Sequence, residues 1–278
     1  MACFSWYSRL GGRGENECGM RSFVGRLAYV DSILITMFLK RSVCSLLLML
    51  AFAGVQAQSL NTLSAQEKKE GWKLLFDGQD LKGWHKYNGK GVPSSWKVEQ
   101  GVLHLDVPKT ATGTVRDGGD LVTDAVISGD FAFKAEYKIE KYTNSGFFFF
   151  VEEAPKNEKI YNTGLEVQVG DDVLYQKAVE HPHNSGDLFG IADVRIQEPQ
   201  PLGTWNKVEV MLKKNKLTVT INGYVVQEHD LTSADWKKRM AASKLKDAPV
   251  GKGKYSGRIG LQDWNTSVWF RNIKLRTL

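Results

Sequence analysis

Apolar and polar residues alternate one by one along much of this 278-residue sequence, which is the pattern of β-strands with one buried face. The longest run is FAFKAEYKIE (131–140), in which every second residue from Phe131 to Ile139 is apolar. Runs typical of further short strands lie at 96–106, 207–230, 258–263 and 268–278. The sequence therefore predicts an all-β fold rather than a helical or mixed one.

Turn signals between these runs favour antiparallel pairing. Gln100-Gly101 and Asn222-Gly223 separate neighbouring runs, and Asn-Gly is the strongest short hairpin signal. One short helix is expected at 233–244, with Thr232 or Ser233 as its cap. Many short strands with one short helix and no βαβ spacing predict an antiparallel sandwich of jelly-roll type.

The N-terminal region has the composition of a targeting segment. Residues 37–57 contain Lys40 and Arg41, then an apolar run, then Val55-Gln56-Ala57 as a small-residue cleavage site. The apolar run is too short to span a bilayer comfortably, so no stable membrane insertion is expected after cleavage. We expect residues 1–36 to be an upstream extension, 37–57 a signal peptide, and 58–278 a single exported domain, periplasmic or extracellular.

Charge and cysteine content narrow the class further. The formal net charge of +6 falls to +3 once residues 1–57 are set aside, and no basic tract with interleaved aromatic residues stands out. That balance argues against nucleic acid as the partner. All three cysteines lie within residues 1–57, so the predicted domain has neither a disulfide nor a cysteine-ligated metal.

Two strands carry the candidate chemistry. TGLEVQVGDD (163–172) places apolar side chains on one face and Glu166 and Gln168 on the other, while NSGFFFFVEE (144–153) is apolar on both faces and therefore central. An aromatic floor beside Glu166 and Gln168 would suit a sugar ring, which stacks on aromatic side chains. The alternative is that these phenylalanines are simply core.

A short loop adds histidines and a carboxylate. HPHNSGD (181–187) holds His181, His183 and Asp187, which could bind a divalent cation or supply an acid to a leaving group. Solvated loop histidines are the alternative, and no cofactor is established beyond this candidate cation. Asp263 and Arg271 are polar residues in apolar strands, and an internal salt bridge or a hydrogen bond to a loop is the expected role of Arg271.

Eight segments in order resemble one bacterial family, the 3-keto-disaccharide hydrolase domain. They are LLFDGQDLKGW (74–84), WKVEQGVLHL (96–105), NSGFFFFVEE, TGLEVQV, SGDLFG (185–190), GTWNKVEV (203–210), ING (221–223) and IGLQDWNTSVWFRNIKLR (259–276). The resemblance implies a concanavalin-like sandwich that is exported and degrades oligosaccharides or other glycosides whose sugar carries a ketone at carbon 3.

This chain departs from the family pattern in two places. Members often read LQDHG where this chain has Trp264 and Asn265 after Asp263, and many have an arginine after the NSG strand where this chain has Glu152 and Glu153. Both departures concern substrate preference.

The residue types also discriminate between mechanisms. Sandwich glucanases carry a strand with Glu, Asp and Glu projecting into the cleft, whereas the equivalent run here is Glu166, Gln168 and Asp171. The central carboxylate is therefore an amide, which handicaps a two-carboxylate retaining mechanism. A 3-keto sugar requires only one base to remove the acidified hydrogen on carbon 2, with donors or a cation for the enolate oxygen. The leaving group at carbon 1 then departs by elimination, and later addition of water gives net hydrolysis.

These arguments define the predicted site. Glu166 is the candidate base or metal ligand, and His183 and Asp187 complete the catalytic set. The residues expected to bind substrate are Asn144, Gln168, Asp171, His181, Asp263, Trp264 and Trp84. The alternative function is a non-catalytic carbohydrate-binding module, which would need the aromatic and polar groups but no acid–base set.

Overall fold

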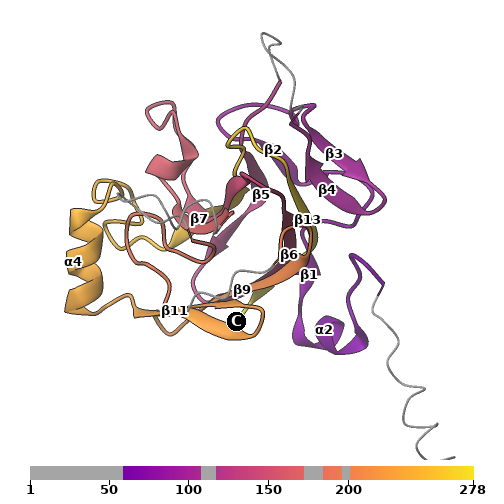
Figure 1. The fold of residues 1–278 in the computed structure, drawn as a ribbon. Coiled ribbons are helices and arrows are strands. Elements are labelled where there is room, and N and C mark those ends of the chain that lie inside the picture. Colours follow the sequence, from indigo (N-terminus) through magenta and orange to yellow (C-terminus); the bar gives the residue numbers. More distant parts are fainter. Residues whose placement is uncertain (1–58, 108–116, 172–183, 196–200) are drawn as a thin grey trace, which may run out of the picture. The chain divides into compact units, whose positions relative to one another are not determined.

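Two antiparallel sheets make up the described domain. The chain divides into two units, residues 1–57 and 58–278, and the computed structural model describes 59–107, 117–171, 184–195 and 201–278, all in the second unit. The larger sheet has eight strands in the order β11-β10-β9-β6-β13-β4-β3, with β1 also pairing with β13. The smaller sheet has the order β2-β5-β12-β7-β8. Every strand pair is antiparallel, as predicted. Figure 1 shows the strands of both sheets together with helices α2 and α4.

Most of the strands fall in the runs predicted from the sequence, and β1, β2 and β5 are additional. In the larger sheet they are β1 Lys73–Leu74, β3 Trp96–Glu99, β4 Val102–Leu105, β6 Phe131–Ile139, β9 Trp205–Lys213, β10 Lys216–Ile221, β11 Tyr224–Asp230 and β13 Val268–Thr277. In the smaller sheet they are β2 Trp84–Lys86, β5 Leu121–Ser128, β7 Asn144–Val151, β8 Leu165–Gly170 and β12 Ser256–Leu261. The Gln100-Gly101 and Asn222-Gly223 turns lie where predicted.

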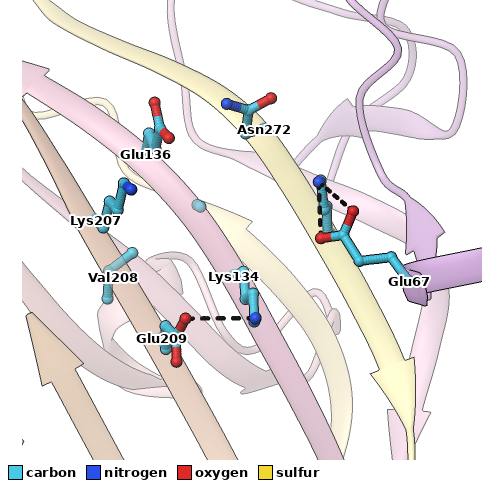
Figure 2. Close-up of a pocket in the computed structure, with 9 residues that line it drawn as sticks. Glu67, Lys134, Glu136, Lys207, Val208, Glu209 and Asn272 are labelled. Atoms are coloured by element: carbon cyan, nitrogen blue, oxygen red, sulfur yellow. Dashed lines mark hydrogen bonds and ion pairs between the residues drawn. The ribbon is translucent and has the colours of Figure 1, made fainter. Parts of the chain in front are cut away.

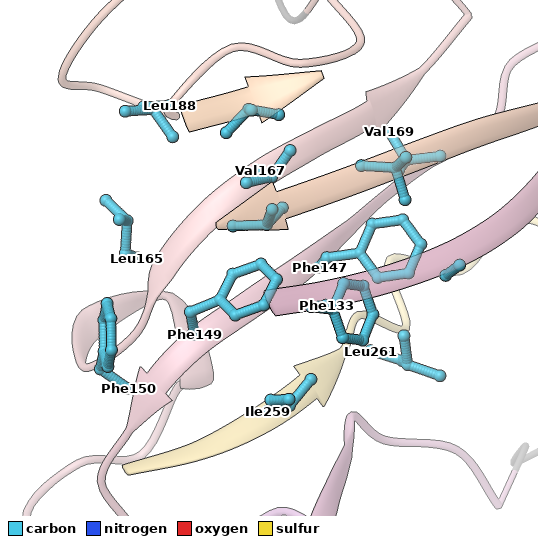
Figure 3. Close-up of a cluster of buried hydrophobic side chains, with 14 of the residues drawn as sticks. Phe133, Phe147, Phe149, Phe150, Leu165, Val167, Val169, Leu188, Ile259 and Leu261 are labelled. Carbon is cyan, nitrogen blue, oxygen red and sulfur yellow. The ribbon is translucent and has the colours of Figure 1, made fainter. Parts of the chain in front are cut away.

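The core between the sheets is rich in phenylalanine (Figure 3). Phe133 of β6 meets Phe149 of β7 edge to face, with ring centroids 5.2 Å apart, and Phe147 makes a similar contact with Phe270 of β13. Edge-to-face pairs of this kind add about 0.5–1.5 kcal/mol each beyond the area that they bury. The apolar face of β8, including Val167, packs into the same core.

Strand β7 is central and buried on both faces, but its aromatic residues do not form a floor for a ligand. Phe148 lies on the outer face in a small cluster with Tyr87 and Ile160 and is fully buried. Phe150 has a positive φ of 64°, and the pairing of β12 with β7 shifts register there. This bulge returns Phe150 to the core between the sheets. The core alternative was therefore correct for both residues.

Among the described residues, two α-helices accompany the sheets, where the sequence predicted one. The predicted helix is α4, Ala234–Ala242, and Ser233 caps it by accepting a hydrogen bond from the Trp236 amide. The additional helix is α2, Ala65–Glu70, which begins with a Ser64–Glu67 capping box, and a 3₁₀ turn covers Ile160–Asn162. Throughout the described ranges, no helix has the length and apolar character needed to cross a membrane.

A groove of about 180 Å³ lies on the outer face of the larger sheet (Figure 2). Lys274 of β13 donates to both carboxylate oxygens of Glu67 at 2.9 Å, which ties α2 to the sheet. Lys134 pairs with Glu209 across neighbouring strands at 3.5 Å. We call this region the charged groove; it is lined by Glu67, Lys134, Ala135, Glu136, Lys207, Val208, Glu209, Asn272 and Lys274. Beside it, Arg271 pairs with Glu136 at 2.6 Å, so the predicted internal salt bridge of Arg271 is confirmed.

Candidate active site

A second hollow, of about 270 Å³, lies on the polar face of β8. We call it the cleft; its lining residues come from β7, β8 and four connecting segments: Asn144, Tyr161, Glu166, Gln168, Phe189, Lys244, Gln262 and Trp264. The alternation of β8 explains its position, because Leu165, Val167 and Val169 fill the core and turn Glu166 and Gln168 to the opposite face.

Backbone pairing on both sides of β8 fixes Glu166. Strand β7 pairs with one edge of β8, and segment 184–189 pairs with the other, where the Phe189 amide donates to the Glu166 carbonyl at 3.1 Å. The carboxylate lies over Gly146 of β7, and a Cβ atom at position 146 would stand only 2.7 Å from Glu166 Oε1. Glu166 is 3% exposed, so its carboxylate is held in a nearly dry position.

Lys244 places a cation beside this carboxylate. Its Nζ lies 3.9 Å from Glu166 Oε2, 3.9 Å from the ring centroid of Phe189 and 4.9 Å from that of Tyr161. The side chain starts from a tight turn after α4, anchored by the buried Ser243 and Leu245. The amine is therefore presented to the cleft from a fixed backbone.

Burial changes the proton affinities of both groups. It raises the pKa of the Glu166 carboxyl above its ordinary value, although the nearby Lys244 charge acts in the opposite direction. It lowers the pKa of the Lys244 amine, against the influence of Glu166. Both shifts bring the pKa values of Glu166 and Lys244 closer to neutral pH, where each group can accept and return a proton.

Amides supply the remaining polar surface of the cleft. Gln168 donates through Nε2 to Asn144 Oδ1 at 2.8 Å and to the Ser145 carbonyl at 3.2 Å. A hydrogen bond between Gln262 and Glu166 lowers the pKa of that carboxyl, while Gln262 Oε1 is buried without a donor among the described residues. The carboxylate thus stands between an amide and a cation.

Aromatic rings form the outer wall of the cleft. Tyr161 and Trp264 meet edge to face with centroids 5.9 Å apart, and Trp264 is 48% exposed. Exposed rings beside hydrogen-bonding amides are what the apolar and polar faces of a sugar require. The aromatic surface that the sequence placed in β7 is therefore supplied by connecting segments.

Four of the predicted site residues come together in the cleft: Asn144, Glu166, Gln168 and Trp264. His181 and His183 lie outside the described residues, and their predicted roles stay predictions. Among the residues described, no cluster of three or more His, Cys, Asp or Glu side chains is arranged to hold a metal ion.

Asp187 and Asp171 are buried hydrogen-bond acceptors that do not line the cleft. Asp187 is buried; its Oδ1 accepts from the Val194 amide at 2.6 Å and its Oδ2 from the Asn184 amide at 2.8 Å. This carboxylate braces the segment that pairs with β8 and so supports the cleft; its predicted catalytic role stays a prediction. Asp171 is also buried and accepts from the Tyr142 amide at 2.9 Å; it does not line the cleft, and its predicted contact with substrate stays a prediction.

Trp84 and Asp263 are likewise absent from the cleft lining. Trp84 is buried in the core and donates through Nε1 to the Leu75 carbonyl at 2.6 Å, so the prediction that it binds substrate was wrong. Asp263 accepts from the amides of Gly119 and Asn265 at 2.8 and 3.0 Å and thereby shapes the turn that presents Trp264.

The turn at Asp263 also places a second carboxyl near the site. Asp120 Oδ1 accepts from the Asp263 amide at 2.8 Å. Burial raises the pKa of Asp120 to about 7, and the Asp120 charge in turn raises the pKa of Glu166.

The sequence did not point to four lining residues: Tyr161, Phe189, Lys244 and Gln262. Phe189 and Gln262 lie within the segments SGDLFG and IGLQDWN, so a site signal was present for these two. Tyr161 and Lys244 lie in segments with no strand periodicity or motif.

The fold and the cleft define an antiparallel β-sandwich with a buried glutamate beside a lysine on its smaller sheet. Residues 71–276 match the family model described as the 3-keto-alpha-glucoside-1,2-lyase-like domain, and the chain belongs to this family. The family resemblance of the sequence is thus confirmed.

Three matches share most of their length with this chain. A 3-keto-disaccharide hydrolase of Bacteroides thetaiotaomicron is 28% identical over 245 residues, 81% of this chain and 84% of the relative. A crystal structure from Parabacteroides distasonis, named as a candidate glycosyl hydrolase, is 30% identical with a TM-score of 0.68 and covers 79% of this chain and 100% of its own. A second P. distasonis structure of the same name is 21% identical with a TM-score of 0.56, which shows the shared fold.

Proposed function

We propose that this protein is an enzyme that cleaves glycosides whose sugar carries a ketone at carbon 3, by base-assisted elimination at carbons 1 and 2. The observation that carries the proposal is the position of Glu166, buried in the cleft with the Lys244 cation 3.9 Å away. Family membership and the name of the B. thetaiotaomicron relative support this choice of substrate class.

Each group in the cleft has a defined part in this reaction. The Glu166 carboxylate removes the proton from carbon 2, which the neighbouring ketone has made acidic. Negative charge then develops on the ketone oxygen, and the Lys244 ammonium stabilises it in a site with little water. The carbon 1–oxygen bond breaks, the leaving oxygen takes up a proton, and the sugar is left with a double bond between carbons 1 and 2. Addition of water to that bond gives net hydrolysis.

The single carboxylate distinguishes this reaction from ordinary glycoside hydrolysis. A retaining glycosidase needs two carboxyl groups about 5–5.5 Å apart, one as nucleophile and one as acid. Among the described residues that line the cleft, Glu166 is the one carboxylate. Gln168, on the same face of β8, is an amide and cannot serve as the second carboxyl group. One base with one cation suffices for elimination.

Comparison of a glucoside with its 3-keto form tests the proposal. The purified domain should release the aglycone from the 3-keto glucoside and leave the parent glucoside intact. Turnover of the parent glucoside at an equal rate would reject the elimination. Binding of either sugar without turnover would favour a non-catalytic carbohydrate-binding module, for which the exposed Trp264 ring would suffice.

Export of the mature chain is part of the same proposal. It is supported by the signal-like residues 37–57, and glycoside breakdown outside the cytoplasm would suit an exported enzyme. N-terminal sequencing should show that the mature protein begins near Gln58. A mature protein that begins upstream of residue 37 would contradict the proposal.

A further inference from the structure

Lys244 has an environment that a purely electrostatic role does not require. Its nitrogen faces the aromatic rings of Phe189 and Tyr161 and the Glu166 carboxylate, and its side chain is 28% exposed. Burial lowers the pKa of the amine, so part of it is neutral and nucleophilic near neutral pH. An amine in such a site, beside a carboxyl that can exchange protons, is suited to react with a carbonyl group.

We propose that Lys244 is a covalent catalyst that forms a Schiff base with the ketone at carbon 3 of the substrate. This inference rests on the proposed function, because that function supplies the ketone. It adds a covalent intermediate that is absent from the elimination described above, in which Lys244 acts only through its charge.

Formation and release of the Schiff base require only Lys244, Glu166 and water. The Lys244 amine attacks carbon 3 and forms a carbon–nitrogen bond, and the ketone oxygen departs as water with the aid of a proton from Glu166. The product is an iminium cation, and Glu166 is now a carboxylate. Glu166 takes the proton from carbon 2, and the resulting enamine expels the oxygen at carbon 1, which receives the proton back from Glu166. Water then adds to the conjugated iminium and releases Lys244 and the unsaturated 3-keto sugar, so that the initial protonation states are restored.

The surroundings of Lys244 serve the iminium as well as the ammonium. Both species carry a positive charge on the same nitrogen, and aromatic faces attract such a charge at 3.9 and 4.9 Å. The iminium draws electrons from carbon 2 more strongly than a neutral ketone does, which makes removal of that proton by Glu166 easier. The anchored turn at Ser243 and Leu245 keeps the nitrogen in one place through the cycle.

Reductive trapping tests the covalent step. The probe is the 3-keto form of 1,5-anhydroglucitol, which offers the ketone but has no leaving group at carbon 1. With sodium cyanoborohydride, the domain should gain the mass of this sugar less one oxygen atom, and peptide mapping should place the adduct on Lys244. Lys238, on the exposed part of helix α4, is the internal control and should stay unmodified.

Variants separate this proposal from the electrostatic alternative. Lys244→Arg keeps the cation but cannot form a Schiff base, so it should lose both trapping and turnover, about 10²-fold or more. Failure of the wild-type domain to be trapped, with Lys244→Arg retaining most turnover of a 3-keto glucoside, would overturn the covalent role and leave the proposed function standing. Absence of any wild-type turnover of the 3-keto glucoside would overturn both.

Discussion

Two glutamate–lysine pairs, one at each sheet of this sandwich, differ in their geometry and in their exposure to solvent. In the charged groove, Lys274 donates to both oxygens of Glu67 at 2.9 Å, and the lysine side chain is 6% exposed. In the cleft, Lys244 lies 3.9 Å from Glu166, and its side chain is 28% exposed. Glu67 and Lys274 hydrogen-bond directly to each other. Glu166 and Lys244 are farther apart, so that a ligand could contact both.

The difference follows from which elements supply the partners. Lys274 lies on a central strand, and the capping residue of α2 reaches over it, so the contact fixes the helix to the sheet. Lys244 and Glu166 come from a turn and from strand β8, with aromatic rings around the nitrogen instead of further acceptors. The directly bonded pair, Glu67 and Lys274, therefore holds the helix on the sheet. The separated pair, Glu166 and Lys244, is the candidate for contact with a ligand.

The largest expected effect separates the two pairs by activity. Glu166→Gln should lower kcat by about 10²–10⁴-fold, because the base for carbon 2 is lost. Its thermal stability should be unchanged or higher, since a buried carboxyl with a raised pKa is replaced by a neutral amide. Steady-state kinetics on a 3-keto glucoside, with thermal melting of the same samples, checks both statements. Undiminished turnover would remove Glu166 from the mechanism.

The opposite result is expected for the charged groove. Glu67→Gln keeps a residue suited to the capping box but removes the charge opposite the buried Lys274, and should cost about 3 kcal/mol of unfolding free energy. Activity should stay unchanged. Adding Lys274→Met to Glu67→Gln should restore most of the lost stability, because no buried charge is then left alone. Denaturant unfolding measures both variants, and a loss of turnover at full stability would place the groove in the catalytic machinery.

A third experiment concerns the space that Glu166 occupies. Gly146→Ala would put a Cβ atom 2.7 Å from Glu166 Oε1, so the carboxylate must move, and a displacement of about 1 Å can cost 10²-fold in kcat. Gly89→Ala is the matched control, since its Cβ would meet only the flexible Lys86 side chain, at 3.2 Å. Equal kcat values for the two variants would show that the position of Glu166 is not critical.

A fourth experiment concerns the dependence of stability on pH. The pKa of Asp120 is raised to about 7 in the folded protein, against about 3.9 in an unfolded chain. Between these values the folded state binds the extra proton, so the contribution of Asp120 to stability is present below about pH 4 and is lost as pH rises through about 7. Asp120→Asn should reduce this loss of stability between about pH 4 and pH 7.

Asp120→Asn should also move the acid limb of the kcat/KM profile to lower pH, because the Asp120 charge raises the pKa of Glu166. Identical pH profiles for both proteins would exclude the coupling.

Much of the sandwich could be predicted because strand alternation is a local signal. Strand β6 and the three strands at 205–230 follow from period-two patterns and turn dipeptides alone. Strand β5, Leu121–Ser128, was not predicted, and its alternation is interrupted by polar Thr123 and Asp124. Helix α2 was missed because its six residues, AQEKKE, have no apolar face and depend on a cap and on Lys274.

Most of the correctly predicted part of the candidate site lies on strands, and Trp264, in the segment between β12 and β13, is the exception. Glu166 and Gln168 were found because the alternation of β8 sets them apart from the core. Lys244 and Tyr161 approach Glu166 through turns and tertiary packing, for which a linear sequence has no periodic signal. Asp187 was predicted from its neighbourhood in the sequence, and only the fold shows that its carboxylate is buried and accepts from the backbone amides of Asn184 and Val194.

Removal of the hydrogen on carbon 2 is the central event of this account, and isotopic substitution tests it most directly. The rate of aglycone release should be compared for a 3-keto glucoside and for the same compound with deuterium at carbon 2. The account predicts that the deuterated compound reacts several-fold more slowly, or that its deuterium exchanges with solvent in recovered substrate, and that Glu166→Gln abolishes the exchange. Equal rates with deuterium fully retained at carbon 2 would contradict it.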